Sequence, residues 1–476
     1  MIRIIARREL LEWSRDGRVR WLAGSCVLVL WVVLMVGWQS TRAQIDLRQA
    51  VSERELDNFL GQGDKNPHAA AHFGQYAFRP TLIPAAIDPG VSAWMGSMIW
   101  MEAHRRNLPE FRAAEDGAGR DQASAVSVAW VLQSVVPLLL LIAGFASIAG
   151  ERERGTLPQL LAQGVPMRMI VIGKGLAILV AISLVLAPLL IAVTALHGFT
   201  PQTASQHEAG IRLAAMGGVY LLYFLGFAGV VLCVSLIART VRTALTTLLV
   251  LWVGLIVLVP RFAADAAAAR HPLPAATEFW ASIKRGEGAD VISEIPAERA
   301  ARLRASLAAE LLARYGVDRI EDLPVNFTAV YLQTLEEADA PIFDHAYGRL
   351  WNAQEQQRAM RSGFGVFSPT VSLREISMAL AGSDPFALWH FSQSAESHRR
   401  TLVAELNGIQ ARDGAGRGFF VAPAETWAGI TRFNYGPPSL LEVVQRHTRD
   451  VWLLFLWAAI PLSLAFYLAG KVRPTR

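Results

Sequence analysis

The chain has 476 residues, of which 53% are hydrophobic and only 18% are charged. Soluble globular proteins usually have about a quarter charged residues, so this composition argues against an ordinary soluble protein. The formal net charge is +5, and the basic residues lie mostly near the ends of apolar segments rather than in one soluble patch suited to nucleic acid. We therefore expect a protein that contacts the lipid bilayer and binds no nucleic acid.

Six apolar segments are long enough to cross a bilayer as helices. A basic, amphipathic stretch at residues 1–19 precedes the first, and we expect it to be an interfacial helix rather than a plain basic flank. Its charged residues are Arg3, Arg7, Arg8, Glu9 and Glu12, and its apolar side includes Ile2, Ile5, Leu10 and Trp13. No cleavage site follows the first segment, which favours a retained anchor over a signal peptide. The sequence thus predicts an all-α, polytopic membrane protein with six transmembrane helices and a mainly helical extracytoplasmic domain. The predicted spans are residues 20–38, 126–149, 170–196, 213–237, 244–259 and 451–469.

Basic residues in the short loops predict the orientation in the membrane. Arginines precede the first span, and four basic residues lie between the second and third spans, whereas the short loop at 197–212 has only Arg212. Both termini are therefore expected to be cytoplasmic, and in a bacterial cell the chain would lie in the inner (cytoplasmic) membrane. The predicted cytoplasmic parts are residues 1–19, 150–169, 238–243 and 470–476, and the predicted extracytoplasmic parts are residues 39–125, 197–212 and 260–450.

The two long extracytoplasmic segments show helical periodicity, and no alternating strand pattern of any length is present. Proline at the start, glutamate in the first turn and a following glycine predict a helix over Pro296–Tyr315. Asp384 is expected to cap another long helix that ends near Arg412. Prolines between residues 79 and 84 indicate extended chain. The other predicted helices are residues 45–60, 326–335 and 346–360.

The loop between the second and third spans reads GERERGTLPQLLAQGVPMRMIVIGK over residues 150–174. A cluster of four charged residues precedes Gly155, and a short amphipathic segment follows with Leu157, Leu160 and Leu161 on one face. Pro166 ends this segment, and a second basic group leads into the next span. Charged residues alone commonly end a span, so they do not by themselves indicate a functional loop. A functional role is favoured by the combination of the charges, the leucines, Pro166 and the Gly173-Lys174 pair at the end of the loop.

Together with the six spans, the pattern ExExGTL…LL…P.R…GK resembles the permease subunit of a type-2 ABC exporter. A second group of residues resembles the subgroup of that family with a large extracytoplasmic insert before the last transmembrane helix. This group consists of Ser368-Pro369, Leu380-Ala381-Gly382-Ser383-Asp384, His390-Phe391, Ala395-Glu396, His398-Arg399-Arg400 and Leu406-Asn407.

The resemblance implies a coupling helix at about residues 156–163 that docks in a groove on a separate cytoplasmic ABC ATPase. It also implies a second permease copy, identical or related, and ATP and magnesium bound by the ATPase subunits, so that this chain would bind no cofactor. The residues that it implies for ATPase coupling are Glu151, Arg152, Glu153, Gly155, Thr156, Leu157, Leu160, Leu161, Pro166 and Arg168.

No motif for catalysis or nucleotide binding is present in the sequence. Gly173-Lys174 lacks both the upstream glycine and the following Ser or Thr of a phosphate-binding loop. No nucleophile elbow occurs, and His207-Glu208 lacks the second histidine of the zinc-protease helix motif, because residue 211 is isoleucine. We therefore expect a non-catalytic chain.

Four other histidines are of interest as possible ligands. His68 and His72 are four residues apart and could share a helix face for a metal ion. The flanking sequence offers no clear third ligand, so solvated histidines are favoured and no metal site is expected. His390 and His398 lie on a charged helix, where a surface or packing role is favoured.

The predicted spans contain almost no ionisable residues, which argues against a proton- or ion-coupled carrier. Gln133 and Ser134 are the main polar exceptions, and helix packing is favoured for them over a transport pathway. Gly226 and Gly229 give the fourth span a small-residue face that could pack within the chain or across a dimer.

These observations favour a permease subunit of an ATP-driven exporter, coupling a cytoplasmic ATPase to substrate export across the inner membrane. The alternative is an ATPase-driven mechanotransmission or interaction protein, which would act on a periplasmic partner without transport. The large extracytoplasmic insert motivates this alternative. An outer-face enzyme is disfavoured, because six spans exceed what an anchor needs and no catalytic constellation supports it.

Overall fold

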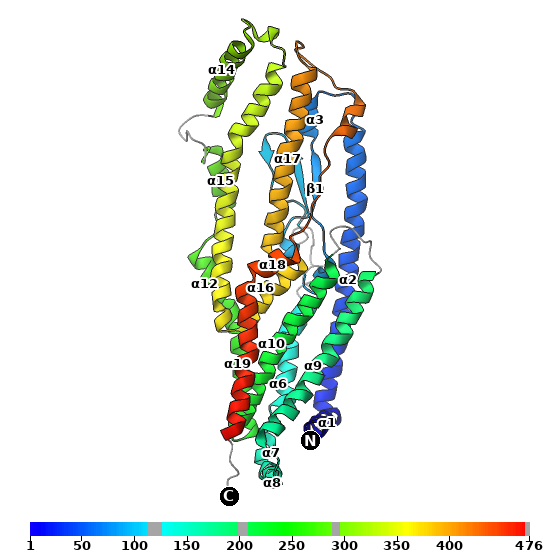
Figure 1. The fold of residues 1–476 in the computed structure, drawn as a ribbon, viewed down its shortest axis with the longest axis vertical. Coiled ribbons are helices and arrows are strands. Elements are labelled where there is room, and N and C mark those ends of the chain that lie inside the picture. Colours follow the sequence, from blue (N-terminus) through cyan, green and yellow to red (C-terminus); the bar gives the residue numbers. More distant parts are fainter. Residues whose placement is uncertain (113–125, 199–207, 288–295, 472–476) are drawn as a thin grey trace.

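The computed structural model describes residues 1–112, 126–198, 208–287 and 296–471. The molecule is elongated, and nearly all of its regular structure is helical (Figure 1). Helix α1 (Ile2–Arg15), α7 (Ala149–Glu153), α8 (Thr156–Ala162) and the last turn of α19 (Thr448–Lys471) lie at one end, which we call the loop end. We call the described residues within 61–112 and 271–447 the distal part.

Within the described ranges, six helices are long and apolar enough to cross a membrane. This confirms the all-α, polytopic fold expected from the sequence. Two of the six contain a π-helical segment, η4 or η6. The six are α2 (Gly17–Leu60); α5 (Val128–Trp130) continued by η4 (Val131–Val135), α6 (Val136–Gly144) and α7; α9 (Met167–Gly198); α10 (Ala209–Ile237); α11 (Val241–Trp252) continued by η6 (Val253–Leu258) and α12 (Val259–Arg270); and α19.

Helix α10 lies at the centre of the spans and packs against α19, α9 and α6. Its small residues permit this close approach. A Cβ atom on Gly226 would lie 2.9 Å from the Trp457 carbonyl oxygen of α19, and one on Gly229 would lie 2.7 Å from the Pro461 Cβ atom. The small-residue face of α10 therefore packs within the chain, against α19, which settles an alternative that the sequence left open.

Helix α2 continues without a break from the first predicted span up to the start of the distal part (Figure 1). At 1.5 Å per residue its 44 residues extend over about 66 Å, whereas the hydrocarbon core of a bilayer is about 30 Å thick. The predicted span (20–38) and the predicted helix at 45–60 are thus one element. The residues between them include no glycine or proline, and Arg42 pairs with Asp46 one turn later at 3.0 Å.

The distal part is built mainly from two long helices, α15 (Phe327–Gly363) and α17 (Pro385–Asp413), which pack against each other (Figure 1). A small antiparallel sheet and α3 lie against α17. The remaining helices of this part are α3 (Pro67–Phe73), η1 (Ile83–Ala86), η2 (Ser92–Trp94), α13 (Ala276–Lys284), α14 (Pro296–Tyr315), η7 (Ile320–Asp322), η8 (Phe364–Val366), α16 (Pro369–Ala381), η9 (Ala424–Gly429) and α18 (Leu440–Arg446).

The sheet consists of β1 (Gln75–Phe78), β2 (Met98–Glu102) and β3 (Arg105–Arg106) in the order β1-β2-β3. Gln75 pairs with Met101 and Phe78 with Met98. The sequence does not predict these strands, because strands of two to five residues are too short to display a clear period of two. The strands are a minor component, and the distal part remains mainly helical.

Two of the distal helices confirm the sequence prediction. Helix α14 has the predicted bounds, and α17 begins after Asp384, whose side chain accepts a hydrogen bond from the Ala387 N–H at 3.1 Å. Two other predictions were wrong in detail. The predicted helices at 326–335 and 346–360 are one helix, α15, with Pro341 inside it. Residues 83–86 form a 3₁₀ turn rather than extended chain.

Candidate functional site

The helix of the second span is broken just before the loop end. Helix α6 ends at Gly144, and α7 begins at Ala149. Ser235 of α10 provides hydrogen-bond partners for backbone groups at this break. Its hydroxyl accepts hydrogen bonds from the N–H groups of Ile148 (2.9 Å) and Ala149 (3.1 Å) and donates to the Phe145 carbonyl (3.1 Å). Because these groups are buried, the hydroxyl fixes the position of α7 relative to α10.

Two charged side chains of α7 bind the corner between α10 and α11. Arg152 donates to the carbonyl oxygens of Leu236, at 2.8 Å, and Ala238, which are free at the C-terminal end of α10. The Glu153 carboxylate accepts a hydrogen bond from the Val241 N–H at 2.7 Å, at the N-terminal end of α11. Each charge is matched to the partial charge of the helix end that it contacts.

A buried ion cluster joins α7 to α1 and α9. The Lys174 Nζ atom of α9 lies 2.6 Å from Glu9 Oε2 of α1 and 3.2 Å from Glu151 Oε1 of α7. All three residues are at most 5% exposed, and Ser147 donates a further hydrogen bond to Glu9. Removing one partner of such a buried pair typically costs about 3–5 kcal/mol, so the three helices are firmly held together.

The position of Glu9 differs from the sequence interpretation. The sequence placed it with the charged face of the amphipathic N-terminal helix, whereas the structure buries it towards α9. Gly173 permits this contact: a Cβ atom there would lie 2.7 Å from the Ile5 Cβ atom of α1. The Gly173-Lys174 pair thus provides both close packing and the cation that Glu9 requires.

Helix α8 follows α7 through Gly155, whose φ of 72° lies in the left-handed region that favours glycine. The Thr156 hydroxyl donates to the Glu151 carbonyl at 3.1 Å. Since Glu151 is itself part of the ion cluster, α8 is attached to the same buried group as α1 and α9.

The leucine face of α8 is directed towards the spans. Leu157 is 3% exposed and belongs to the apolar core of the spans, and Leu160 and Leu161 pack partly buried against that core. The three leucines do share one face, as the sequence indicated, but that face is not available to a partner. The exposed residues of α8 and its C-terminal turn are Pro158, Gln159, Ala162, Gln163 and Gly164.

The remaining predicted residues lie at the start of α9. Pro166 is exposed, and its carbonyl accepts a hydrogen bond from the Met169 N–H at 2.9 Å. The Arg168 guanidinium lies 4.6 Å from the centre of the Phe466 ring of α19. The structure therefore brings the ten predicted coupling residues into one region, although several of them contact the spans rather than solvent.

A second polar junction joins the spans to the distal part at α16. Tyr220 and Tyr223 of α10 are hydrogen-bonded to Ser377 and Thr370 of α16, each at 3.1 Å. Gln133 of the second span donates to the Tyr220 hydroxyl at 3.0 Å. Gln133 is thus part of a packed contact between helices, which agrees with the helix-packing role favoured from the sequence.

Part of the insert signature forms this junction. Ser368 caps α16 by accepting from the Thr370 N–H at 3.1 Å, and Ser383 donates to the Asp88 carbonyl at 2.9 Å. The Asp88 carboxylate accepts hydrogen bonds from Ser377 and, at 3.1 Å, from the Gly90 N–H. Burial raises the pKa of Asp88, despite these hydrogen bonds. The signature residues from 368 to 383 therefore hold the distal part against the spans.

The other histidines have different outcomes. His390 Nδ1 lies 3.0 Å from the Tyr435 hydroxyl, and the His398 ring lies 5.3 Å from that of Phe433, which confirms packing roles. His207 lies outside the described residues. His68 and His72 were expected to lack a third ligand, and this was wrong, because His104 lies beside them. No sequence pattern connects residue 104 to residues 68 and 72.

The six long apolar helices and the helices packed against them define a multi-pass membrane protein. A family model described as ABC-2 family transporter protein matches residues 3–302, which is more than half of the chain. The chain therefore belongs to the ABC-2 family of transporter proteins, and this membership implies an ATPase partner within the transporter. A second model, described as Domain of unknown function (DUF3526), matches residues 276–436. None of the curated proteins matches the chain.

Proposed function

We propose that the chain is the non-catalytic permease subunit of an ATP-driven exporter in the bacterial inner membrane, with both termini in the cytoplasm. In this proposal α8 is the coupling helix, and its exposed residues dock on a separate ABC ATPase that binds ATP and magnesium. The observation that carries the proposal is that α8 is exposed on one side and attached on the other to a buried ion cluster shared by α1, α7 and α9.

The contacts of α7 support the transmission of movement from α8 to the spans. Lys174 connects α7 to α1 and α9, and Arg152 and Glu153 connect it to the ends of α10 and α11. Separating these groups would leave buried charges unpaired, which is costly. A displacement of α8 by the ATPase would therefore move several spans together rather than deform the loop.

We also propose that the chain works with a second permease copy, identical or related, and belongs to the subgroup with a large extracytoplasmic insert. Two ATPase subunits need two coupling helices, and the described residues of one chain provide one. The match to a domain of unknown function over residues 276–436 supports the subgroup, because it covers the segment between the fifth and sixth long apolar helices.

The test changes the exposed face of α8 and leaves its buried face intact. We expect the tagged wild-type chain, purified from its native host in mild detergent, to retain an ABC ATPase. The variant Gln159→Lys/Ala162→Lys should lose that ATPase, because both residues are exposed on α8. A change at Leu157 would be a poor test, since this side chain is in the protein core.

The matched control is Gln49→Lys/Ala50→Lys, which makes the same substitutions at exposed positions of α2. It should retain the ATPase. Equal ATPase recovery with both variants would contradict the assignment of α8 as the docking element. Recovery of a second permease chain in the same sample would distinguish a heterodimer from a homodimer.

One observation favours the second candidate, an ATPase-driven protein that acts on a periplasmic partner without transport. The continuous helix α2 and the α16 junction connect the spans directly to the distal part. ATP-dependent accumulation of host metabolites in inverted vesicles would contradict this candidate. An ATP-dependent change in distance between spin labels at Glu53 of α2 and Glu310 of α14, without accumulation, would support it.

A further inference from the structure

Three histidine rings meet in the distal part, away from the loop end. His68 and His72 lie on α3, and His104 lies in the turn between β2 and β3. The centres of the three rings are 4.8–5.2 Å apart. Their ligand nitrogens lie within 4.8 Å of one another. Both segments are close in space because β2 and α3 pack against the same helix, α17.

Hydrogen bonds determine which nitrogen of His68 is protonated. Its Nδ1 atom lies 3.0 Å from Asn407 Oδ1, and the Asn407 amide nitrogen donates to Gln333 at 3.1 Å. Gln333 in turn donates to the Glu337 carboxylate at 2.8 Å. An ionised carboxylate can only accept, so the Gln333 amide nitrogen must face Glu337 and its oxygen must face Asn407. The Asn407 amide nitrogen therefore faces Gln333, and its oxygen faces His68. His68 Nδ1 must then be the donor and carry the proton. The His68 Nε2 atom is left with a lone pair.

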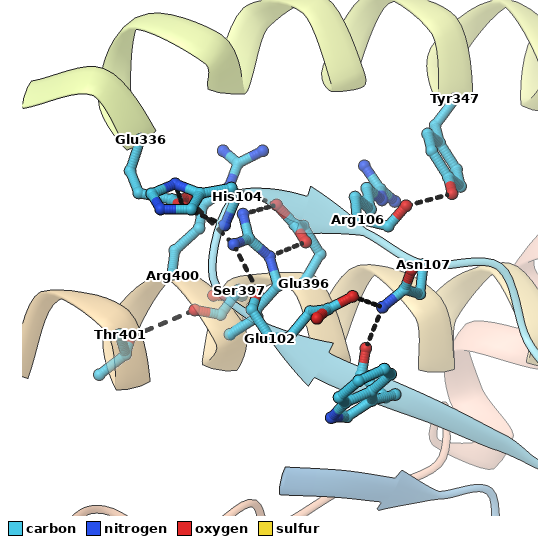
Figure 2. A network of polar contacts seen from close by, with 12 residues as sticks. Glu102, His104, Arg106, Asn107, Glu336, Tyr347, Glu396, Ser397, Arg400 and Thr401 are labelled. Atoms are coloured by element: carbon cyan, nitrogen blue, oxygen red, sulfur yellow. Dashed lines mark hydrogen bonds and ion pairs between the residues drawn. The ribbon is translucent and has the colours of Figure 1, made fainter. Parts of the chain in front are cut away.

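His104 is oriented in the same way by a carboxylate. Its Nδ1 atom lies 2.9 Å from Glu336 Oε1, so this nitrogen carries the proton and Nε2 has the lone pair. The backbone N–H of His104 also donates to Glu336 (Figure 2). Arg399 holds Glu336 from the other side at 3.0 Å. The carboxylate is therefore fixed before any ligand binds.

The two unprotonated nitrogens face each other. The Nε2 atoms of His68 and His104 are 3.2 Å apart, and two lone pairs at this distance repel unless a cation lies between them. Two imidazole nitrogens bound to one tetrahedral zinc ion at about 2.0–2.1 Å would lie about 3.3 Å apart. The separation thus suits two ligands of one metal ion.

We propose that His68, His72 and His104 bind a zinc ion, with a fourth position open to water on the exposed side of His72. Three imidazole ligands and one open position are typical of zinc. The Asn407 and Glu336 contacts are the outer hydrogen bonds that commonly orient zinc-bound histidines. This inference is independent of the proposed transport function.

Zinc at this position would connect the layers of the distal part. His68 is bonded to Asn407 of α17, and His104 is bonded to Glu336 of α15. One ion would therefore join α3 and the β2–β3 turn, and through the outer contacts would brace them against both long helices. Binding would stabilise this packing by mass action.

The experiment measures zinc binding to the full-length chain in detergent, purified with a tag that contains no histidine. The protein is first treated with a chelator and then dialysed against zinc, and bound metal is determined by mass spectrometry. We expect about one zinc ion per chain, and a visible absorption typical of tetrahedral cobalt when Co²⁺ replaces zinc.

His72→Ala is the principal variant, because this side chain is exposed and its removal leaves the core packing intact. It should weaken zinc binding by about tenfold or more, as should His104→Ala. The matched control is His345→Ala, an exposed histidine on α15 outside the cluster, which should bind zinc as the wild type does.

Three outcomes would overturn the proposal: no zinc bound by the wild type after dialysis, equal affinity in the His72, His104 and His345 variants, or a strong preference for copper or nickel with no zinc retained. If the two Nε2 atoms instead share a proton, the chain will bind no zinc. The melting temperature of each variant without metal checks that lost binding does not reflect unfolding.

Discussion

Two buried clusters, one at the loop end and one in the distal part, each place a cation between two carboxylates but differ in geometry. At the loop end Lys174 lies between Glu9 and Glu151, and in the distal part Arg399 lies between Glu336 and Glu396. The lysine ammonium is a compact charge with one contact to each carboxylate. The arginine guanidinium contacts Glu396 through two nitrogens, at 2.8 and 3.0 Å, and Glu336 through the third.

The difference in the cation indicates how rigidly each cluster holds its partners. A planar guanidinium with fixed donors holds its partners in one arrangement, whereas an ammonium can keep its contacts while the helices around it shift slightly. Although burial opposes ionisation, the hydrogen bonds from His104 and the charge of Arg399 lower the pKa of Glu336 to about 2. We infer that the distal cluster fixes a rigid site and that the loop-end cluster permits concerted movement.

The largest expected effect comes from Arg399→Met. This variant leaves buried Glu336 without its arginine, leaves Glu396 with Arg400 alone, and frees the Glu102 carbonyl, which accepts from Arg399 at 3.1 Å. We expect a loss of about 3–5 kcal/mol in the free energy of unfolding, measured by denaturant titration in detergent. Arg400→Met is the control, because Arg400 is more exposed and should cost about 0–1 kcal/mol. Equal losses would contradict the proposed rigidity of the distal cluster.

Lys174→Met should have a somewhat smaller effect, about 3 kcal/mol, since the ammonium makes fewer contacts. It should also uncouple the ATPase, so that the rate of ATP hydrolysis by the copurified complex equals that of the ATPase without the permease. Adding Glu9→Gln and Glu151→Gln should restore part of the stability, because the unpaired charges are then removed. Lys471→Met, at the exposed end of α19, is the control. Normal ATPase regulation in the Lys174 variant would argue against transmission through this cluster.

The sequence predicted the elements better than the contacts between them. Apolar length and helix caps are local signals, so the spans, α14 and α17 could be recognised. Lys174 and Glu9 are 165 residues apart, and His104 and Glu336 are 232 residues apart, so no spacing in the chain connects them. Glu9 looked like a surface charge because periodicity shows which residues share a helix face, but not which face meets a neighbour.

Gly226→Ala tests the close packing of α10 against α19, which lies between the two clusters. The added Cβ atom would lie 2.9 Å from the Trp457 carbonyl oxygen, so α10 and α19 must move apart at a cost of about 1–3 kcal/mol. Gly218→Ala on the same helix is the matched control, because a Cβ atom there meets nothing within 4 Å. It should be neutral or slightly stabilising. Thermal unfolding of both variants in the same detergent gives the comparison, and similar melting temperatures would show that the helices are not closely packed.

The smallest change in stability is expected for Thr156→Val, which keeps the shape of the side chain and removes the hydrogen bond to the Glu151 carbonyl. One neutral hydrogen bond contributes about 1 kcal/mol. Thr334→Val in α15 is a matched substitution, since it removes a single hydroxyl bond to the Val330 carbonyl at 2.8 Å in the distal part. Both variants should lose similar stability, but only Thr156→Val should weaken ATPase regulation, because only it loosens α8 from the cluster that carries movement to the spans. If the two variants regulate ATP hydrolysis equally well, the attachment of α8 through Glu151 does not contribute to coupling.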